Sequence, residues 1–221
     1  MSLLALVALV SVTASNKIAE APKCPSIVSA AISVPATPAA VTHEWICPAL
    51  ELSGQVQSDG LLLDPAFSES APLADLARPG TSGHATLQGY GADGRTLFTF
   101  PFDANGPFKL ILPLDAKTQS ELRRLRLISG GKAVERTAAT GGTPDAEIID
   151  VDSSHVLVIW DSTRFPAIRV RDIRTGRILG SGEGSSTYTQ VTFLTSAPEV
   201  QIEFSDGLHT ASQRFTVFGR S

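Results

Sequence analysis

Hydrophobic and polar residues alternate along much of the chain from residue 45 onward. Leu50, Leu52 and Val56 fall on one face of an extended backbone, and the positions between them are polar or glycine. A period of two is typical of a strand that buries one face and exposes the other. The pattern therefore predicts a half-buried strand, and Asp59-Gly60 supplies the turn that follows it.

Phenylalanines mark the next group of strands. Phe98, Phe100 and Phe102 share one face of an extended segment, so we expect them in a core. Turn signals such as Asn105-Gly106 separate these apolar runs. This part of the chain predicts strands over 84–90, 96–102, 108–114 and 125–128, a loop over 67–82, and one short helix over 115–124 with Thr118 and Glu121 at capping-box spacing.

A break in the pattern divides the chain. Residues 137–144 are threonine, alanine, glycine and proline with no apolar period, which is typical of a link between domains. Seven further short strands follow, a number that suits a sandwich. They are expected over 146–151, 155–161, 167–173, 177–180, 188–194, 199–204 and 209–218.

These elements predict an all-β fold with two antiparallel β-sandwich-like domains and one short helix, behind a signal segment and a Pro/Ala-rich linker. The expected divisions are a signal segment over 1–14, a linker over 15–44, a β-rich domain over 45–139 and a second sandwich over 144–221.

One strand of the second sandwich carries a family resemblance. The stretch His155-Val-Leu-Val-Ile-Trp160-Asp161 resembles the early Trp-bearing core strand of fibronectin type III and immunoglobulin-like sandwiches. This resemblance implies that Trp160 is buried between two sheets. The segment Phe204-Ser-Asp-Gly-Leu208 and the basic final strand are more loosely similar to the C-terminal accessory regions of secreted bacterial metallopeptidases. That second resemblance implies a non-catalytic module.

The N-terminus has the features of an export signal. Ten mostly apolar residues, Leu3 to Val12, precede Val12-Thr13-Ala14, a small-residue pattern that suits signal-peptidase cleavage. An apolar run of this length is too short for a transmembrane helix, which needs about 20 residues. We therefore expect an exported protein, periplasmic or extracellular, without a transmembrane anchor.

The two cysteines of the chain, Cys24 and Cys47, both precede the first strongly patterned strand. In an oxidising compartment they are candidates for a disulfide that ties the Pro/Ala-rich linker to the first domain. Spacing alone also allows two free thiols, because it does not show whether the two Cα atoms approach each other.

Composition narrows the class of protein. With 43% hydrophobic and 18% charged residues, the chain of 221 residues has the make-up of a folded protein rather than a disordered one. A net charge of −4 provides no overall field that attracts phosphate backbones, so we expect no nucleic-acid partner.

Motifs for catalysis and metal binding do not match. His43-Glu44 resembles the start of a zinc-protease helix, but the second ligand position holds Cys47 and Pro48 follows it. The glycine-rich stretch over 180–184 lacks both a nucleophilic serine at its centre and the lysine of a phosphate-binding loop, and predicts a plain loop. We expect no catalytic residue, no metal and no cofactor.

The strongest charge feature is a group of five arginines in the second sandwich. In an extended strand Arg169 and Arg171 project from one face, whereas Ile168 and Val170 project from the other. The expected result is a solvent-facing stripe that either grips an anionic partner or is an ordinary solvated surface. The candidate binding residues are Arg164, Arg169, Arg171, Arg174 and Arg177.

The favoured hypothesis is a non-catalytic exported binding or spacer module that contacts protein or glycan. One alternative is a detached C-terminal accessory region of a secreted metallopeptidase. Another is a glycan hydrolase that uses a carboxylate pair such as Asp103 and Glu135, which would have to face each other about 5 to 10 Å apart. The sequence leaves the ligand and the oligomeric state open.

Overall fold

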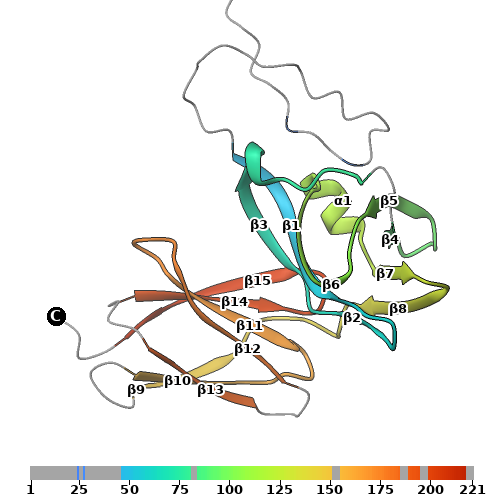
Figure 1. Cartoon of the computed structure of the whole chain (residues 1–221). Helices are drawn as coiled ribbons and strands as arrows, with labels where there is room; N and C mark the ends of the chain where they lie inside the picture. Colours follow the sequence, from blue (N-terminus) through green and yellow to red (C-terminus); the bar gives the residue numbers. More distant parts are fainter. Residues whose placement is uncertain are drawn as a thin grey trace, which may run out of the picture.

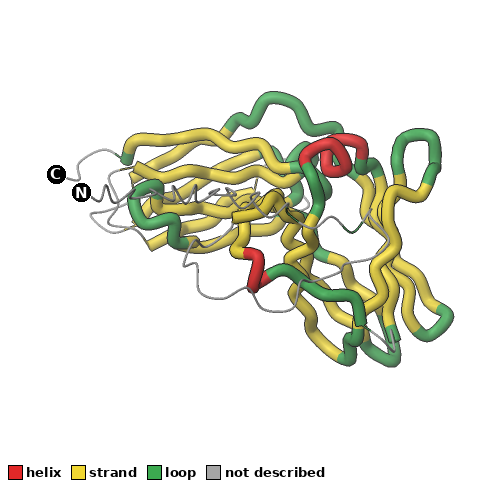
Figure 2. The backbone as a smooth tube through the Cα atoms, turned by 90° about the horizontal axis from the view of Figure 1, so that it is seen from above, coloured by secondary structure: helices red, strands yellow, loops and turns green. Residues whose placement is uncertain are grey.

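A computed structural model describes Cys24, Ile27 and residues 46–80, 84–150, 155–184, 189–194 and 199–217. Its sheets are antiparallel throughout and form two sandwiches, as predicted (Figure 1). Figure 2 shows the two sandwiches side by side, with the strands of one running at a steep angle to those of the other. The predicted signal segment and most of the linker lie outside the described residues.

The first sheet of the N-terminal sandwich is organised by the long strand β1 (Ile46–Val56). Strand β6 (Gly106–Pro113) pairs with one edge of β1 along most of its length. Two shorter strands, β2 (Leu61–Leu63) and β3 (Phe67–Pro72), lie end to end along the other edge. The side chains of β1 alternate between buried and half-buried, which confirms the predicted period of two.

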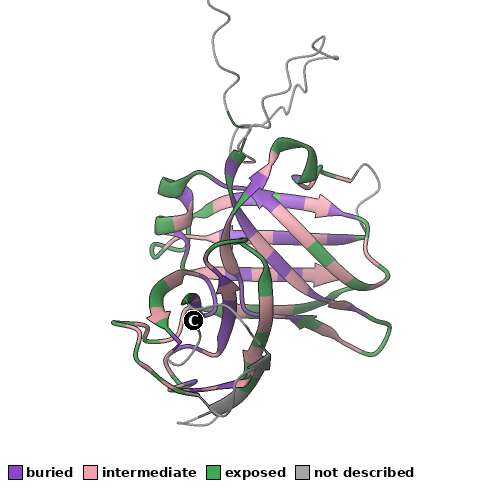
Figure 3. Ribbon diagram, turned by 90° about the vertical axis from the view of Figure 1, so that its left-hand side faces the viewer, coloured by how far each residue is buried: buried purple, intermediate pink, exposed green. Residues whose placement is uncertain are grey.

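The second sheet of this sandwich has the strand order β5-β4-β7-β8. Its members are β4 (Ala85–Tyr90), β5 (Thr96–Phe102), β7 (Arg124–Ser129) and β8 (Lys132–Thr137). Leu50 and Leu52 of the first sheet share one core with Phe98, Phe100 and Phe102 of the second. Figure 3 shows buried positions as purple bands that recur along the strands of the molecule.

Three local predictions in this sandwich need correction. Residues 67–72, predicted as loop, form β3, and the 3-10 turn η1 (Leu73–Asp75) follows it. The strand β8 was not predicted, because most of its side chains are exposed and polar. The helix α1 (Ala116–Glu121) is capped by Asp115, whose side chain accepts a hydrogen bond from the Thr118 backbone N–H, so the proposed capping box is wrong.

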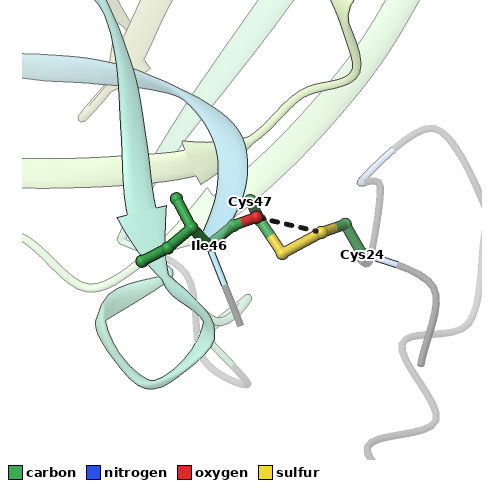
Figure 4. Close-up of a disulfide and its surroundings, with 3 residues drawn as sticks. All are labelled: Cys24, Ile46 and Cys47. Carbon is green, nitrogen blue, oxygen red and sulfur yellow. Dashed lines mark hydrogen bonds between the residues drawn. A yellow bond between two sulfur atoms is a disulfide. The ribbon is translucent and has the colours of Figure 1, made fainter. Parts of the chain in front are cut away.

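The chain before β1 is fastened to this sandwich at two points. Cys24 and Cys47 form a disulfide with their Cα atoms 5.6 Å apart (Figure 4). Cys47 is buried beside Ala49 and Ala71, and the Ile27 N–H donates to the Pro113 carbonyl at 3.2 Å. Closing a loop of this size typically stabilises a fold by about 3 kcal/mol through the unfolded state.

The C-terminal sandwich holds the seven strands that the sequence predicted. One sheet has the order β13-β10-β9, from β9 (Ala146–Asp150), β10 (His155–Trp160) and β13 (Thr189–Leu194). The other has the order β12-β11-β14-β15, from β11 (Ala167–Asp172), β12 (Ile178–Glu183), β14 (Glu199–Ser205) and β15 (Thr210–Thr216). Strand β12 includes most of the glycine-rich stretch that the sequence predicted as a loop.

Trp160 anchors the core of this second sandwich. Its side chain is 1% exposed, lies in one core cluster with Ile168, Val170 and Phe204, and donates from Nε1 to the Phe165 carbonyl at 2.8 Å. The predicted burial of Trp160 between the sheets is thereby confirmed.

We expect Trp160→Ala to lower the free energy of unfolding by about 3–5 kcal/mol, because it removes a large buried side chain and leaves a cavity. Urea titration of both proteins measures this difference. Ile149→Ala, in the adjacent strand but 39% exposed, is the matched control. A loss below about 1 kcal/mol for Trp160→Ala would show that the tryptophan does not anchor the core.

Candidate functional site

The predicted arginine stripe lies at the junction between the two sandwiches. Arg169 and Arg171 project from one face of β11, and Ile168 and Val170 are buried in the C-terminal core on the other. The predicted alternation of side chains is therefore present. The expectation that the arginine face points to solvent is wrong, because β1 and β3 of the N-terminal sandwich lie against it.

Arg169 is the most buried charged residue at this junction, at 3% exposed. Its Nε lies 2.6 Å from Glu203 Oε2, its Nη2 lies 3.0 Å from Glu69 Oε2, and its Nη1 lies 3.3 Å from Glu51 Oε1. The guanidinium carbon also lies 4.4 Å from the centre of the Phe67 ring. One side chain of β11 therefore contacts β1, β3 and β14 at once.

Arg171 shares two of these carboxylates. Its Nε lies 2.9 Å from Glu203 Oε1, its Nη2 lies 3.0 Å from Glu69 Oε2, and its Nη1 donates to the Gly176 carbonyl at 2.8 Å. Burial alone lowers the pKa of Arg171, but the hydrogen bonds and charges of Glu203 and Glu69 outweigh it and the pKa is raised. The guanidinium is thus held in its charged form.

We call these five residues the junction cluster: Arg169, Arg171, Glu51, Glu69 and Glu203. Lys109 adds a third positive charge, with its Nζ 3.2 Å from Glu51 Oε2. Three cations therefore face three carboxylates, and the charge of the arginines is balanced within the protein. The junction cluster holds the two sandwiches together and leaves little charge for an external anion.

The other three predicted arginines lie apart from the junction cluster. Arg164 donates to the carbonyls of Gly141 and Thr143, at 3.0 and 3.2 Å, and so fixes the connection between the sandwiches. Arg174 and Arg177 are exposed at the turn between β11 and β12. The five residues therefore do not form one surface.

A second contact at the junction, which we did not predict from the sequence, is apolar. The turn between β14 and β15 (residues 206–209), which we call the hairpin plug, inserts Leu208 into the core of the N-terminal sandwich. Leu208 is 1% exposed. A large apolar residue in a hairpin turn was the only sequence signal for this contact.

Two hydrogen bonds to the backbone of Ala66 hold the hairpin plug in place. The Ala66 N–H donates to the Gly207 carbonyl at 3.0 Å, and the Ser205 hydroxyl donates to the Ala66 carbonyl. Ala66 is free to make both bonds because it lies in the gap between β2 and β3, directly after Pro65. Gly207 has a φ of +108°, and a Cβ there would lie 3.0 Å from the Thr137 carbonyl oxygen.

His209 links the hairpin plug to the end of α1. Its Nδ1 lies 3.1 Å from Asp206 Oδ2, and its Nε2 lies 3.3 Å from Arg123 Nη1. The hydrogen bond to Asp206 raises the pKa of His209, although burial and the charge of Arg123 act in the opposite direction. Folding therefore favours the charged imidazole relative to the unfolded chain.

The carboxylate pair considered from the sequence does not form. Asp103 follows β5 and Glu135 lies on β8, and these strands are the opposite edges of one four-stranded sheet. Three strand spacings amount to about 14 Å, which exceeds the separation in glycosidases. Glu135 is also paired with Arg124 and Arg126. The proposed pairing of Asp103 with Glu135 is therefore wrong.

A small hollow of about 170 Å³ remains beside the junction cluster, with Asp64 and Glu183 in its wall. Burial raises the pKa of Glu183, as does the nearby charge of Asp64, while Arg136 opposes the shift. Pockets for small molecules usually measure about 300–1,000 Å³. The hollow is therefore too small for an ordinary ligand site.

Comparison with known proteins gives no match, either to a family model or to a curated protein sequence. In the described ranges no helix has the length and apolar character needed to cross a membrane. Nor do His, Cys, Asp or Glu gather there in groups of three or more that suit a metal ion. The functional argument therefore depends on the geometry of the two sandwiches.

We expect Arg169→Met to lower the free energy of unfolding by about 3–5 kcal/mol, because it leaves buried carboxylates without their partner. Chemical denaturation of the purified protein measures the loss. Arg174→Met is the matched control and should change stability by no more than about 0.5 kcal/mol, because Arg174 is exposed. Equal effects of the two substitutions would contradict the assignment of Arg169 to the junction.

We also expect the stabilising effect of His209 to depend on pH. A group whose pKa is raised on folding stabilises the native state fully below its unfolded pKa of about 6.5 and loses this effect as pH rises through the folded value. The stability difference between wild type and His209→Gln should therefore be larger at pH 5.5 than at pH 8.5. Thermal or urea unfolding at both pH values measures it, and a difference that grows with pH would contradict the prediction.

Proposed function

We propose that this protein is a non-catalytic, exported binding or spacer module that presents its outer surfaces to a protein or glycan in one fixed geometry. The observation that carries the proposal is the burial of Arg169 among carboxylates from both sandwiches. A buried charge that is paired with groups from both sandwiches disfavours a hinge between them. Opening such a hinge would separate the charge from its partners. A fixed angle between two sandwiches suits a spacer or a scaffold for binding loops.

The space between the sandwiches supports the same conclusion. Enzymes that bind a substrate between two units need an open cleft there. In this protein the junction cluster and the hairpin plug fill that region, and the hollow beside them is small. Partner contacts are therefore more naturally placed at loop ends and outer sheet faces, where sandwich proteins commonly bind.

We further propose that the C-terminal sandwich is of the fibronectin type III or immunoglobulin-like kind. Seven strands divide into sheets of three and four, and the chain crosses between the sheets after β10, β12 and β13. A buried tryptophan on an early strand, Trp160, fits the core of such a sandwich. The disulfide between Cys24 and Cys47 supports export, since disulfides persist mainly in oxidising compartments.

The fixed geometry can be measured as a distance distribution between spin labels. Lys117→Cys and Arg177→Cys place one label on each sandwich at exposed positions. The reference pair, Lys117→Cys with Lys132→Cys, places both labels within the N-terminal sandwich. We expect a single narrow distribution for the pair that spans the two sandwiches, no wider than that of the reference pair. Two populations, or a much broader distribution for the first pair alone, would indicate a hinge and contradict the proposed rigid module.

A further inference from the structure

A hollow at one end of the N-terminal sandwich, the loop-end hollow, measures about 400 Å³. It lies among the turns β1–β2, β5–β6 and β7–β8 and the start of β4. In Figure 1 the β1–β2 and β7–β8 turns lie on the side of this sandwich away from the C-terminal sandwich. The volume falls in the range of small-molecule sites, about 300–1,000 Å³.

Two hydrogen bonds between loops fix the rim of the loop-end hollow. Lys132 Nζ donates to the Ser58 carbonyl at 2.7 Å, which ties the β7–β8 turn to the β1–β2 turn. The Ser129 hydroxyl donates to the His84 carbonyl at 2.7 Å, which ties the same turn to the start of β4. A rim that is fixed before binding loses less conformational entropy when a ligand arrives.

The rim carries polar groups with hydrogen-bonding capacity to spare. In the described part of the chain, the Asn105 amide and the His84 imidazole have no protein partner. Gln57 uses its Nε2 on Gln55 and keeps its carbonyl oxygen, and Lys132 uses one of three ammonium hydrogens. Such a mixture of donors and acceptors matches the hydroxyl groups of a sugar.

The charge of the loop-end hollow favours an anionic ligand. Lys132 lines it, and no carboxylate does, although the chain as a whole is acidic. The hollow beside α1 differs, because its cations Arg95 and Lys117 both pair with Glu121. Of these two hollows, the loop-end hollow therefore combines a cation that pairs with no carboxylate of the described residues with the amide of Asn105.

We propose that the loop-end hollow binds a hexuronate unit of an acidic glycan. Lys132 pairs with the sugar carboxylate, and Asn105, His84 and Gln57 bind its hydroxyl groups. This inference rests on the proposed function as a binding module and names the class of its ligand. Because the contacts are few and exposed, binding should be weak for one sugar unit and sensitive to salt.

The test uses the full chain and a defined probe, the trisaccharide of mannuronate. We expect saturable changes in the amide NMR signals of residues around His84, Asn105 and Lys132, with isothermal titration giving the affinity. Asn105→Asp should weaken binding about tenfold or more, because it adds a negative charge to the hollow. The substitution suits the fold, since Asp-Gly forms the same tight turn as Asn-Gly.

Lys132→Met should also weaken binding about tenfold, because it removes the cation that pairs with the sugar carboxylate. The matched control is Lys117→Met, beside α1, which should not change binding. Thermal unfolding of each variant shows that it is folded. Signal changes confined to the exposed turn around Arg174 would overturn the loop-end site but not the proposed function as a binding module. Failure of the wild-type protein to bind the trisaccharide at millimolar concentration would have the same meaning. Cleavage of the trisaccharide would overturn the proposed non-catalytic function instead.

Discussion

The arrangement of the two sandwiches depends on the burial of one guanidinium group. Arginine keeps its proton in proteins, so Arg169 can be buried only where carboxylates and an aromatic face surround it. Those partners come from β1 and β3, which are neighbours in one sheet of the N-terminal sandwich, and from β14 of the C-terminal sandwich, which is distant in sequence. The burial of a single charge therefore fixes the relative positions of these strands. Such a cluster need not add stability over apolar packing, but it penalises other arrangements.

Apolar and backbone contacts also hold the two sandwiches together at the junction. Leu208 fills a place in the N-terminal core, so this core is incomplete without the hairpin plug of the other sandwich. The edge strand is interrupted at Ala66, and its free backbone groups bond to Gly207 and Ser205 instead of to a neighbouring strand. Charge, apolar burial and main-chain bonding thus act at one junction. The opposite end of the N-terminal sandwich is left free for a ligand.

The sequence predicted those features that depend on local pattern. Alternation located β1, β4, β5 and β10, because burial of one face repeats every second residue in them. Apolar runs and turn signals located the other strands of the C-terminal sandwich. The sequence pattern missed β3, whose Phe67 and Glu69 face Arg169 rather than a hydrophobic core. Because β3 lies against Arg169, the arginine stripe that we expected at the surface is buried. Glu69 and Arg169 are 100 residues apart, and no local pattern reports such a pairing.

Native-state hydrogen exchange tests most directly whether the junction makes the two sandwiches one cooperative unit. Amides in the centres of β4 and β7 report on the N-terminal core, and those of β11 and β14 report on the C-terminal core. If the junction couples the sandwiches, the slowest amides of both groups will exchange through one opening with the same free energy and the same denaturant dependence. Exchange of either group through a separate, lower-energy opening, while the other stays protected, would contradict this account.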